Sequence, residues 1–248
     1  MWEFLKEPGD DPARGIGVGF TDRDGGVTPG TGGSLSFGAS DGGPEALAEN
    51  LRRLCEAVGI AEVVTLHQVH SPTVITVTAG DVADWDRAAP PDGDALVAAA
   101  DVTGVALAVR AADCVPVVLA DPGSGTIGVA HAGRVGLLAG VVPATVAALR
   151  ALGATHPVAW IGPHIHGADY EVPAAMAADA ARILPVVRAT TSRGTPAIDL
   201  TAGVRAQLAD DGIPVLHVGP STLTDPGQHS YRRDGAAAGR QLGLVWRA

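Results

Sequence analysis

Apolar residues along the chain gather in short runs, and several of these runs show no alternation between apolar and polar positions. The runs are rich in β-branched residues, and a strand that is apolar throughout is typical of a sheet covered on both faces. The candidate strands are residues 62–70, 73–79, 94–99, 104–114, 115–121 and 125–133, then 158–163 and 214–219. The pattern predicts sheets that are packed between other layers.

Helical spacing marks four other segments. In residues 44–58, apolar side chains recur on one face, and Pro44 suits the first turn. That face carries Leu47, Leu51, Leu54, Cys55 and Val58, so Cys55 is expected to be a small buried side chain of the core. Residues 136–153 also look helical, with Pro143 as a bend or as the true start. Residues 174–184 and 200–212 add two helices.

The order of these elements indicates the fold class. Strands come in runs with helices before and after them, which predicts an α/β fold of mixed layers rather than a strict β-α-β alternation. No repeat, charge block or low-complexity linker divides the 248 residues, and the glycine-rich residues 24–44 are typical of an irregular loop. We therefore expect one domain over residues 1–248.

Composition narrows the classes of function. A formal net charge of −10 opposes binding to phosphate backbones, so no nucleic-acid partner is expected. The first residues lack the pattern of a signal peptide, and the apolar runs are too short to cross a bilayer. The 2 cysteines favour a reducing compartment over a disulfide framework. We expect a cytoplasmic protein with no membrane partner, in which a few arginines could still hold a small anion.

Candidate chemistry begins with Cys114 and His131. The segment DPGSG between them favours a tight turn, and a hairpin closing there brings the two residues together at one end. They suit two ligands of a metal, a Cys–His nucleophile pair, or simply a buried cysteine beside a hydrogen-bonded histidine. His67 and His70 lie three positions apart, so in a regular strand they face opposite sides and only one reaches a given site.

Three segments could hold an anion. HAGRVGL carries glycines into a helix start, where backbone N–H groups can face an anion. SYRRDG carries Arg232 and Arg233, and FTDRDGG places Arg23 after an apolar strand. Arginine pairs can clamp a phosphate or carboxylate, although a solvated turn would have the same sequence.

These segments together resemble a known family nearly from end to end. FTDRDGGVT resembles the family's FTTRxGGVS motif, HQVHS resembles its QVHG, and DALV, ADCVPVVLAD and AHAG follow in order. IGPHIHGADYEVP and SYRRDG…GRQ resemble its GPxI…YEV and closing SYRRDG…GR motifs. The family is that of the laccase-domain or multicopper polyphenol oxidase proteins. It is now described as zinc-dependent purine nucleoside phosphorylases with adenosine deaminase activity.

The resemblance implies a zinc ion held by His70, Cys114 and His131. His70 is preferred to His67 because the family's histidine follows Gln-Val. The implied fold is an α-β-β-α sandwich with mixed sheets, related to the catalytic domain of cytotoxic necrotizing factor. The implied substrates are phosphate and a purine nucleoside such as adenosine, inosine or methylthioadenosine, handled by a monomer or small homo-oligomer.

Motif position and residue chemistry suggest further roles. Arg23, Arg232 and the HAGRVG backbone are candidates for holding phosphate. Asp113 and Asp94 are candidates for acid–base work or for orienting a ligating histidine. Asp121 is expected to be a turn residue beside Pro122.

The chain departs from the common family pattern at several positions. HAGWRG is HAGRVG here, so Arg134 sits one place earlier and the tryptophan is absent. Ser36, Ser71 and Leu223 stand where Asn, Gly and Cys are usual. These positions concern substrate contacts rather than the implied ligands.

Three alternative functions are kept. A copper-dependent polyphenol oxidase is the first, because copper can occupy a His₂Cys set. A cysteine hydrolase with Cys114 as nucleophile is the second. The third is a non-catalytic, metal-binding partner protein.

Overall fold

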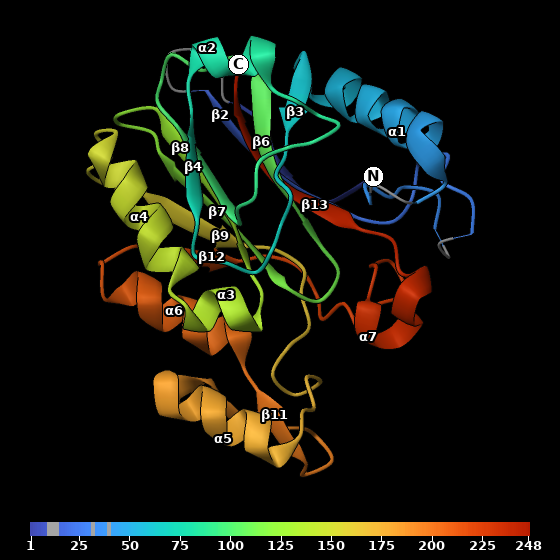
Figure 1. Ribbon diagram of the computed structural model, residues 1–248, viewed down its shortest axis with the longest axis vertical. Helices are drawn as coiled ribbons and strands as arrows, with labels where there is room; N and C mark the ends of the chain where they lie inside the picture. Colours follow the sequence, from blue (N-terminus) through green and yellow to red (C-terminus); the bar gives the residue numbers. More distant parts are fainter. Residues whose placement is uncertain (9–14, 31–32, 39–40) are drawn as a thin grey trace.

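The computed structural model describes residues 1–8, 15–30, 33–38 and 41–248, and two large mixed β-sheets make up most of it (Figure 1). The five-stranded sheet has the order β1-β2-β13-β6-β3, with β3 and β6 parallel and the other neighbours antiparallel. Its strands are β1 (Trp2–Lys6), β2 (Ile16–Thr21), β3 (Glu62–Val64), β6 (Val105–Ala111) and β13 (Gln241–Arg247).

The six-stranded sheet has the order β12-β9-β7-β8-β5-β4, with parallel pairs at its two edges and antiparallel pairs in its centre. Its strands are β4 (Val74–Val77), β5 (Ala95–Ala98), β7 (Val115–Asp121), β8 (Thr126–Ala132), β9 (Val158–Ile161) and β12 (Val215–His217). A separate hairpin pairs β10 (Arg188–Thr190) with β11 (Pro196–Ile198).

Helices cover one face of each large sheet. Figure 1 shows α1 beside the five-stranded sheet and α4 and α6 beside the other sheet. The helices are α1 (Gly43–Val58), α2 (Ala79–Asp84), α3 (Arg134–Leu138), α4 (Val141–Ala151), α5 (Ala174–Ile183), α6 (Leu200–Ala209) and α7 (Tyr231–Asp234). Two 3₁₀ turns span Pro185–Val187 and Gly235–Ala237. In the described part of the chain, no helix has the length and apolar character needed to cross a membrane.

The hydrophobic core explains why the strands are apolar on both faces. On β7, Val117 and Leu119 pack with residues of α4 and α6, whereas Val118 and Ala120 pack with residues of the five-stranded sheet. A third cluster joins the other face of the five-stranded sheet to Leu54 and its neighbours on α1. Alternate side chains of one strand therefore enter two different cores, as the sequence predicted.

The two sheets are joined by a short corner that carries the first candidate residues. β6 ends at Ala111 and β7 begins at Val115, so residues 112–114 cross from one sheet to the other. Asp113 adopts a φ of 86° there, a conformation that costs energy for a residue with a side chain. The predicted strand 104–114 thus ends three residues early, and Cys114 sits in the corner rather than at a strand end.

Several predicted elements are confirmed and others differ. The helix at 44–58 and the hairpin closing after Asp121 are present, and Cys55 packs half-buried against the α1 core. The helix at 136–153 is wrong as one unit, because Gly140, with a φ of 88°, separates α3 from α4. The alternative start at Pro143 is close to the observed one, since α4 begins at Val141. The strand at 62–70 is also wrong after Val64, since only an isolated bridge at His67 follows. Of the predicted loop 24–44, residues 31–32 and 39–40 lie outside the described residues.

Candidate functional site

Three elements bring the predicted ligands together at one end of the six-stranded sheet. Cys114 immediately precedes β7, and His131 lies on β8 opposite Pro116. His70 comes from the loop between β3 and β4. The hairpin therefore positions Cys114 and His131 as the turn chemistry predicted, whereas the third residue depends on a loop.

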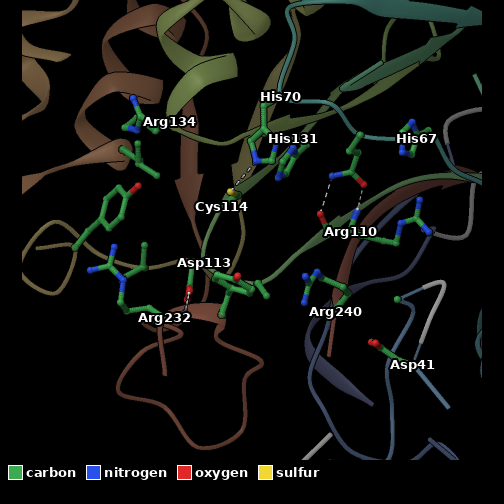
Figure 2. Close-up of a pocket in the computed structure, with 17 residues that line it drawn as sticks. Asp41, His67, His70, Arg110, Asp113, Cys114, His131, Arg134, Arg232 and Arg240 are labelled. Carbon is green, nitrogen blue, oxygen red and sulfur yellow. Dashed lines mark hydrogen bonds between the residues drawn. The ribbon is translucent and has the colours of Figure 1, made fainter. Parts of the chain in front are cut away.

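The geometry of the three side chains is that of a metal-ligand group. The Cys114 Sγ lies 3.8 Å from the His70 Nε2, and the ring centroids of His70 and His131 are 4.9 Å apart (Figure 2). One ligand atom from each residue lies within 4.8 Å of the others. His131 is buried, Cys114 is half-buried and His70 is exposed, so the group opens to the solvent on the His70 side.

Asp94 holds two of these residues in place. Its fully buried carboxylate contacts His131 Nδ1 at 2.8 Å through one oxygen. The other oxygen accepts hydrogen bonds from the backbone N–H groups of Val69 and Ser71, which flank His70. Burial raises the pKa of Asp94, but the hydrogen bonds from His131 and Ser71 outweigh it and hold the pKa at about 2. Asp94 therefore stays ionised and leaves the Nε2 of His131 for a ligand.

The loop carrying His70 is fixed by two further devices. Gln68 exchanges two 2.8 Å hydrogen bonds with the backbone N–H and C=O of Arg110, which docks the loop against β6. His70 itself adopts a φ of 60°. This left-handed backbone turns the imidazole toward Cys114 and breaks the alternation that a regular strand would impose.

Cys114 and His131 form a tightly coupled pair. Burial raises the pKa of the Cys114 thiol, but the charge of His131 and hydrogen bonds from both histidines outweigh it and lower that pKa. Burial lowers the pKa of His131, but the Cys114 charge and the Asp94 hydrogen bond outweigh it and raise that pKa. The pair thus favours a thiolate, which is the form of cysteine that binds a metal.

The donor set agrees with a transition-metal ion. Two imidazoles and one thiolate are ligands that zinc accepts in sites that keep a fourth position open. Asp94 supplies the hydrogen bond that ligating histidines usually receive from a carboxylate. The residues present therefore fit a zinc ion.

A cavity of about 670 Å³ opens in front of this group. In a chain with a net charge of −10, its wall contains a concentration of positive charge. Figure 2 shows Arg134 and Arg232 on one side of the histidines and Arg110 and Arg240 on the other. Clustered guanidinium groups inside a pocket attract anions despite the overall charge.

On the first side, Arg232 is held by its neighbours. Its Nη1 donates to the Glu171 carbonyl at 2.6 Å, and its guanidinium lies 5.1 Å from the centre of the Tyr170 ring. Burial, followed by the charge of Cys114, raises the pKa of Tyr170, so its phenol stays neutral. Asp113 accepts hydrogen bonds from the backbone N–H of Arg232 and the hydroxyl of Thr222, both at 2.6 Å. The carboxylate of Asp113 therefore joins the corner before Cys114 to α7.

On the second side, Arg110 and Arg240 lie near each other. Burial and then the charge of Arg240 lower the pKa of Arg110, whereas Asp41 opposes this shift. Arg110 donates to the Leu66 carbonyl at 2.6 Å, and Arg240 donates to the carbonyls of Ala238 and Gly239. Asp41 lines the same side and places a carboxylate beside the two cations.

Not every predicted residue reaches the cavity. Arg23 is absent from the lining, and its Nη1 donates to the Pro226 carbonyl at 3.0 Å. Arg233 binds the carbonyls of the loop at 222–228 and the carboxylate of Asp234. His67, which the sequence assigned to structure, lines the cavity beside Asp92. Asp121, expected in the turn, is instead the last residue of β7, and its carboxylate accepts a hydrogen bond from the Gly123 N–H of the turn that follows.

Sequence reasoning missed Arg110, Arg240, Tyr170 and Asp41. Arg110 carried a signal, because it is the one charged residue within the apolar run 104–112. A charge in a strand that is otherwise apolar needs a polar environment, and here that environment is the cavity.

Comparison with known proteins gives a consistent result. A family model described as "Multi-copper polyphenol oxidoreductase laccase" matches residues 17–248. Curated relatives named purine nucleoside phosphorylase include one from Streptomyces griseus, which is 47% identical over 92% of this chain and 92% of the relative. Another from Corynebacterium glutamicum is 40% identical over 97% of this chain and 96% of the relative.

Solved structures agree with the sequence relatives. The crystal structure of YlmD from Geobacillus stearothermophilus is 30% identical, with a TM-score of 0.85 over 98% of this chain and 96% of that one. Protein NMB0706 from Neisseria meningitidis is 31% identical, with a TM-score of 0.79 over 98% of each chain. The mixed α/β fold is therefore shared with these proteins, and the chain belongs to the multi-copper polyphenol oxidoreductase laccase family, whose curated relatives are named purine nucleoside phosphorylases.

Proposed function

We propose that the protein is a zinc-dependent purine nucleoside phosphorylase. The observation that carries this proposal is a His₂Cys group at the base of a cavity whose wall holds four arginines in an acidic chain. A neutral nucleoside and an inorganic phosphate are substrates that such a cavity can bind together. The names of the curated relatives support the same reaction.

We assign phosphate to the side of Arg134 and Arg232. Two guanidinium groups give a phosphate dianion several charge-assisted N–H donors. The opposite side carries Asp41, whose carboxylate would repel phosphate but can accept hydrogen bonds from the hydroxyl or N–H groups of a nucleoside. The nucleoside is therefore placed toward Asp41, Arg110 and Arg240.

The reaction requires a balanced exchange of bonds. A phosphate oxygen forms a bond to C1′ of the ribose while the bond from C1′ to the purine nitrogen breaks. The proton of the attacking phosphate ends on the departing purine, and ribose 1-phosphate is the second product. The arginines neutralise the phosphate and hold it in line with C1′, which is the positioning part of catalysis.

Zinc and Asp113 have separate proposed roles. A zinc ion held by His70, Cys114 and His131 would supply a Lewis acid at the base of the cavity. Asp113 is proposed as a positioning residue, because both of its oxygens already accept hydrogen bonds at 2.6 Å. Arg23 keeps only an indirect role, through the loop that it joins to Pro226.

The test is phosphorolysis of inosine, adenosine and methylthioadenosine by the zinc-loaded protein, with and without phosphate. Arg232→Ala should raise the KM for phosphate by about 10-fold or more, because a charge-assisted bond contributes about 1.5–3 kcal/mol. Arg52→Ala is the matched control, since its guanidinium is exposed and pairs with Glu49 and Glu56 on α1, outside the cavity. Turnover that is independent of phosphate would refute phosphorolysis.

The same preparation also tests the alternative functions. Adenosine deamination, which would release inosine without phosphate, stays a prediction for this cavity. Copper in place of zinc, with oxidation of polyphenols and no nucleoside turnover, would support the oxidase. Loss of activity on alkylation of Cys114 in a metal-free but active protein would support the hydrolase, and a metal-loaded protein with no turnover would support a binding role.

Broader expectations also remain proposals. We infer one domain over residues 1–248 and an α-β-β-α order of layers from the way the three core clusters divide the strands. The relation to the cytotoxic necrotizing factor domain, a cytoplasmic location and a monomer or small homo-oligomer stay predictions from the sequence.

A further inference from the structure

A second cluster of histidines lies outside the cavity. His164 and His166 follow β9, and His217 is the last residue of β12. β9 and β12 are parallel neighbours, and His217 pairs with Ile161 in their register. The carboxyl ends of two adjacent strands thus bring together three residues that are far apart in the sequence.

The three rings form a nearly equilateral triangle. The ring centroids are 5.0 Å apart for His164 and His166, 5.2 Å for His164 and His217, and 5.1 Å for His166 and His217. One nitrogen of each ring lies within 4.8 Å of the other two. In the described part of the chain, this is the second of two groups with such spacing.

Two of the three rings have an Nε2 atom that the protein leaves unsatisfied. The Nδ1–H of His164 donates to the Gly162 carbonyl at 2.7 Å, which fixes Nε2 as the atom with the lone pair. That Nε2 contacts the Thr201 hydroxyl at 2.6 Å. The Nε2 atoms of His166 and His217 are buried without a hydrogen-bond partner. Buried polar atoms of this kind call for a ligand that the protein does not itself provide.

The surroundings favour a cation. Asp169 and Asp199 both act on the charge state of His166, and Asp199 also acts on His217. Arg205 is the opposing charge near His217. Burial lowers the pKa of all three histidines, so the rings are neutral and present lone pairs.

We propose that His164, His166 and His217 form a second metal site, which takes a borderline transition-metal dication such as Zn²⁺. Three neutral imidazoles are a complete protein ligand set for zinc when a fourth position stays open. A tetrahedral ion with metal–nitrogen distances of about 2.0–2.1 Å holds its ligand nitrogens about 3.3 Å apart. Small rotations of His166 and His217, which are half-buried, are enough to close the triangle around an ion.

This second site is connected to the wall of the cavity. The backbone N–H of Ile165, between the two histidines, donates to the Asp113 carbonyl at 3.0 Å. The His164 carbonyl accepts from the N–H of Thr222, whose hydroxyl binds Asp113. Ile165 itself lines the cavity. A metal bound by the triangle would therefore stabilise the segment that supports the corner before Cys114.

Zinc stoichiometry is the first test. Tag-free protein is stripped with a chelator, reloaded with Zn²⁺ and freed of excess metal, and we expect two zinc ions per chain. The double variant His70→Ala with Cys114→Ser removes the first site and should retain one zinc. Its melting temperature should rise on addition of Zn²⁺, because a ligand that binds the folded state stabilises it.

Cobalt distinguishes the two sites without any activity assay. One equivalent of Co²⁺ at the first site gives thiolate-to-cobalt charge transfer, whereas a second equivalent in the triangle adds only weak ligand-field bands. His217→Ala should keep the charge-transfer band, bind one metal and weaken the second site by more than about 100-fold, since loss of a ligand exceeds the effect of losing an outer partner. His166→Gln repeats the test if the first variant fails to fold.

His156→Ala is the matched control, because His156 is an exposed histidine that contacts Thr155 outside the triangle. It should bind two metals. The proposal is overturned if the double variant binds no zinc, if His217→Ala binds as much metal as the wild-type chain, or if His156→Ala loses as much metal as His217→Ala. None of these results depends on nucleoside turnover, so the proposed function stands or falls separately.

Discussion

At the residue scale, Gly133 lies close to two members of the His70–Cys114–His131 group. A Cβ added there would lie 2.6 Å from the Cδ2 of His70 and 2.9 Å from the Sγ of Cys114. Real side chains do not approach so closely, so the imidazole or the thiol would have to move. The absence of a side chain at this position is what allows His70 to reach Cys114.

We predict that Gly133→Ala lowers zinc affinity at the first site by about 10–100-fold, the size of effect seen when ligand placement is disturbed. Cobalt charge transfer at Cys114 reports the change. Gly136→Ala, three residues further along on α3, is the control, because its added Cβ would meet no atom closer than 3.4 Å. Equal affinity for both variants would contradict the prediction.

Loss of the Asp94 carboxylate should also weaken metal binding, because this carboxylate orients the candidate ligand His131. In the wild type, both oxygens of the Asp94 carboxylate accept hydrogen bonds from N–H groups. Asp94→Asn puts an NH₂ group in place of one oxygen, so that a donor would face another donor. We expect about a 10–100-fold loss of zinc affinity with the fold retained. Competition against a calibrated chelator measures the loss, and circular dichroism checks the fold. Unchanged affinity would show that His131 is oriented by packing alone.

The candidate metal ligands could be predicted from the sequence more easily than the residues that line the cavity. Cys114 and His131 were predictable because a short turn fixes a hairpin, and hairpin geometry is local. His70 depended on resemblance, since its left-handed backbone has no signature in a single sequence. Arg240 and Asp41 come from loops whose positions are set by distant elements. The triangle was equally hidden, because His217 joins His164 and His166 only through the pairing of β12 with β9.

At the scale of elements, the turn between β7 and β8 depends on Asp121. Its buried carboxylate accepts hydrogen bonds from the backbone N–H groups of Gly123, Thr155 and His156. Burial raises the pKa of Asp121, but these hydrogen bonds outweigh it and lower the pKa from 3.8 to about 2. One side chain thus ties the hairpin to the segment that leads into β9.

We predict that Asp121→Asn destabilises the fold by about 1–3 kcal/mol, the cost of leaving buried donors poorly paired. The folded pKa is lower than the unfolded one, so the stabilisation is present above pH 4 and is lost as the pH falls toward 2. Urea unfolding at pH 7 and at acidic pH measures both effects.

Asp179→Asn is the control for that experiment. Asp179 pairs with Arg182 on the exposed face of α5, so its removal should change stability by less than about 0.5 kcal/mol. A difference between wild type and Asp121→Asn that stays constant down to pH 2 would contradict the assigned role.

Elements were predictable where the local pattern agreed with tertiary packing. α1 has one apolar face, and a glycine occupies the cap position at each of its ends. β7 and β8 are apolar throughout because a hydrophobic core lies on each side of them. The break at Gly140 was not predictable from periodicity, since apolar residues continue across it. The short pieces β10 and β11 have too few residues to show any period.

At the scale of the molecule, charge is distributed unevenly. A net charge of −10 surrounds a cavity that holds four guanidinium groups. An anion such as the proposed phosphate substrate would therefore cross a repulsive field before it meets attraction inside. Salt screens the exposed charges more than the partly buried ones, but chloride also competes for the arginines.

We predict that competition by chloride for the arginines outweighs the screening of the acidic surface. The KM for phosphate should then rise about three-fold or more between about 0.05 M and 0.5 M sodium chloride. Steady-state phosphorolysis at saturating nucleoside measures this, with the KM for the neutral nucleoside as an internal control. A KM for phosphate that falls with salt would mean that the acidic surface, rather than the cavity, limits binding.

β13 forms hydrogen bonds to β2 on one side and to β6 on the other, although it follows every other strand in the sequence. During translation, the edges of β2 and β6 that pair with β13 therefore stay unpaired until residues 241–247 have left the ribosome. A nascent chain stalled just before that point should be readily cleaved by protease, whereas one that includes β13 should be protected. Arg232 and Arg240, which line the cavity, come shortly before β13 in the sequence. The cavity and the five-stranded sheet are therefore completed together, after residues 232–247 have been synthesised, and until then the growing chain exposes the unpaired edges of β2 and β6.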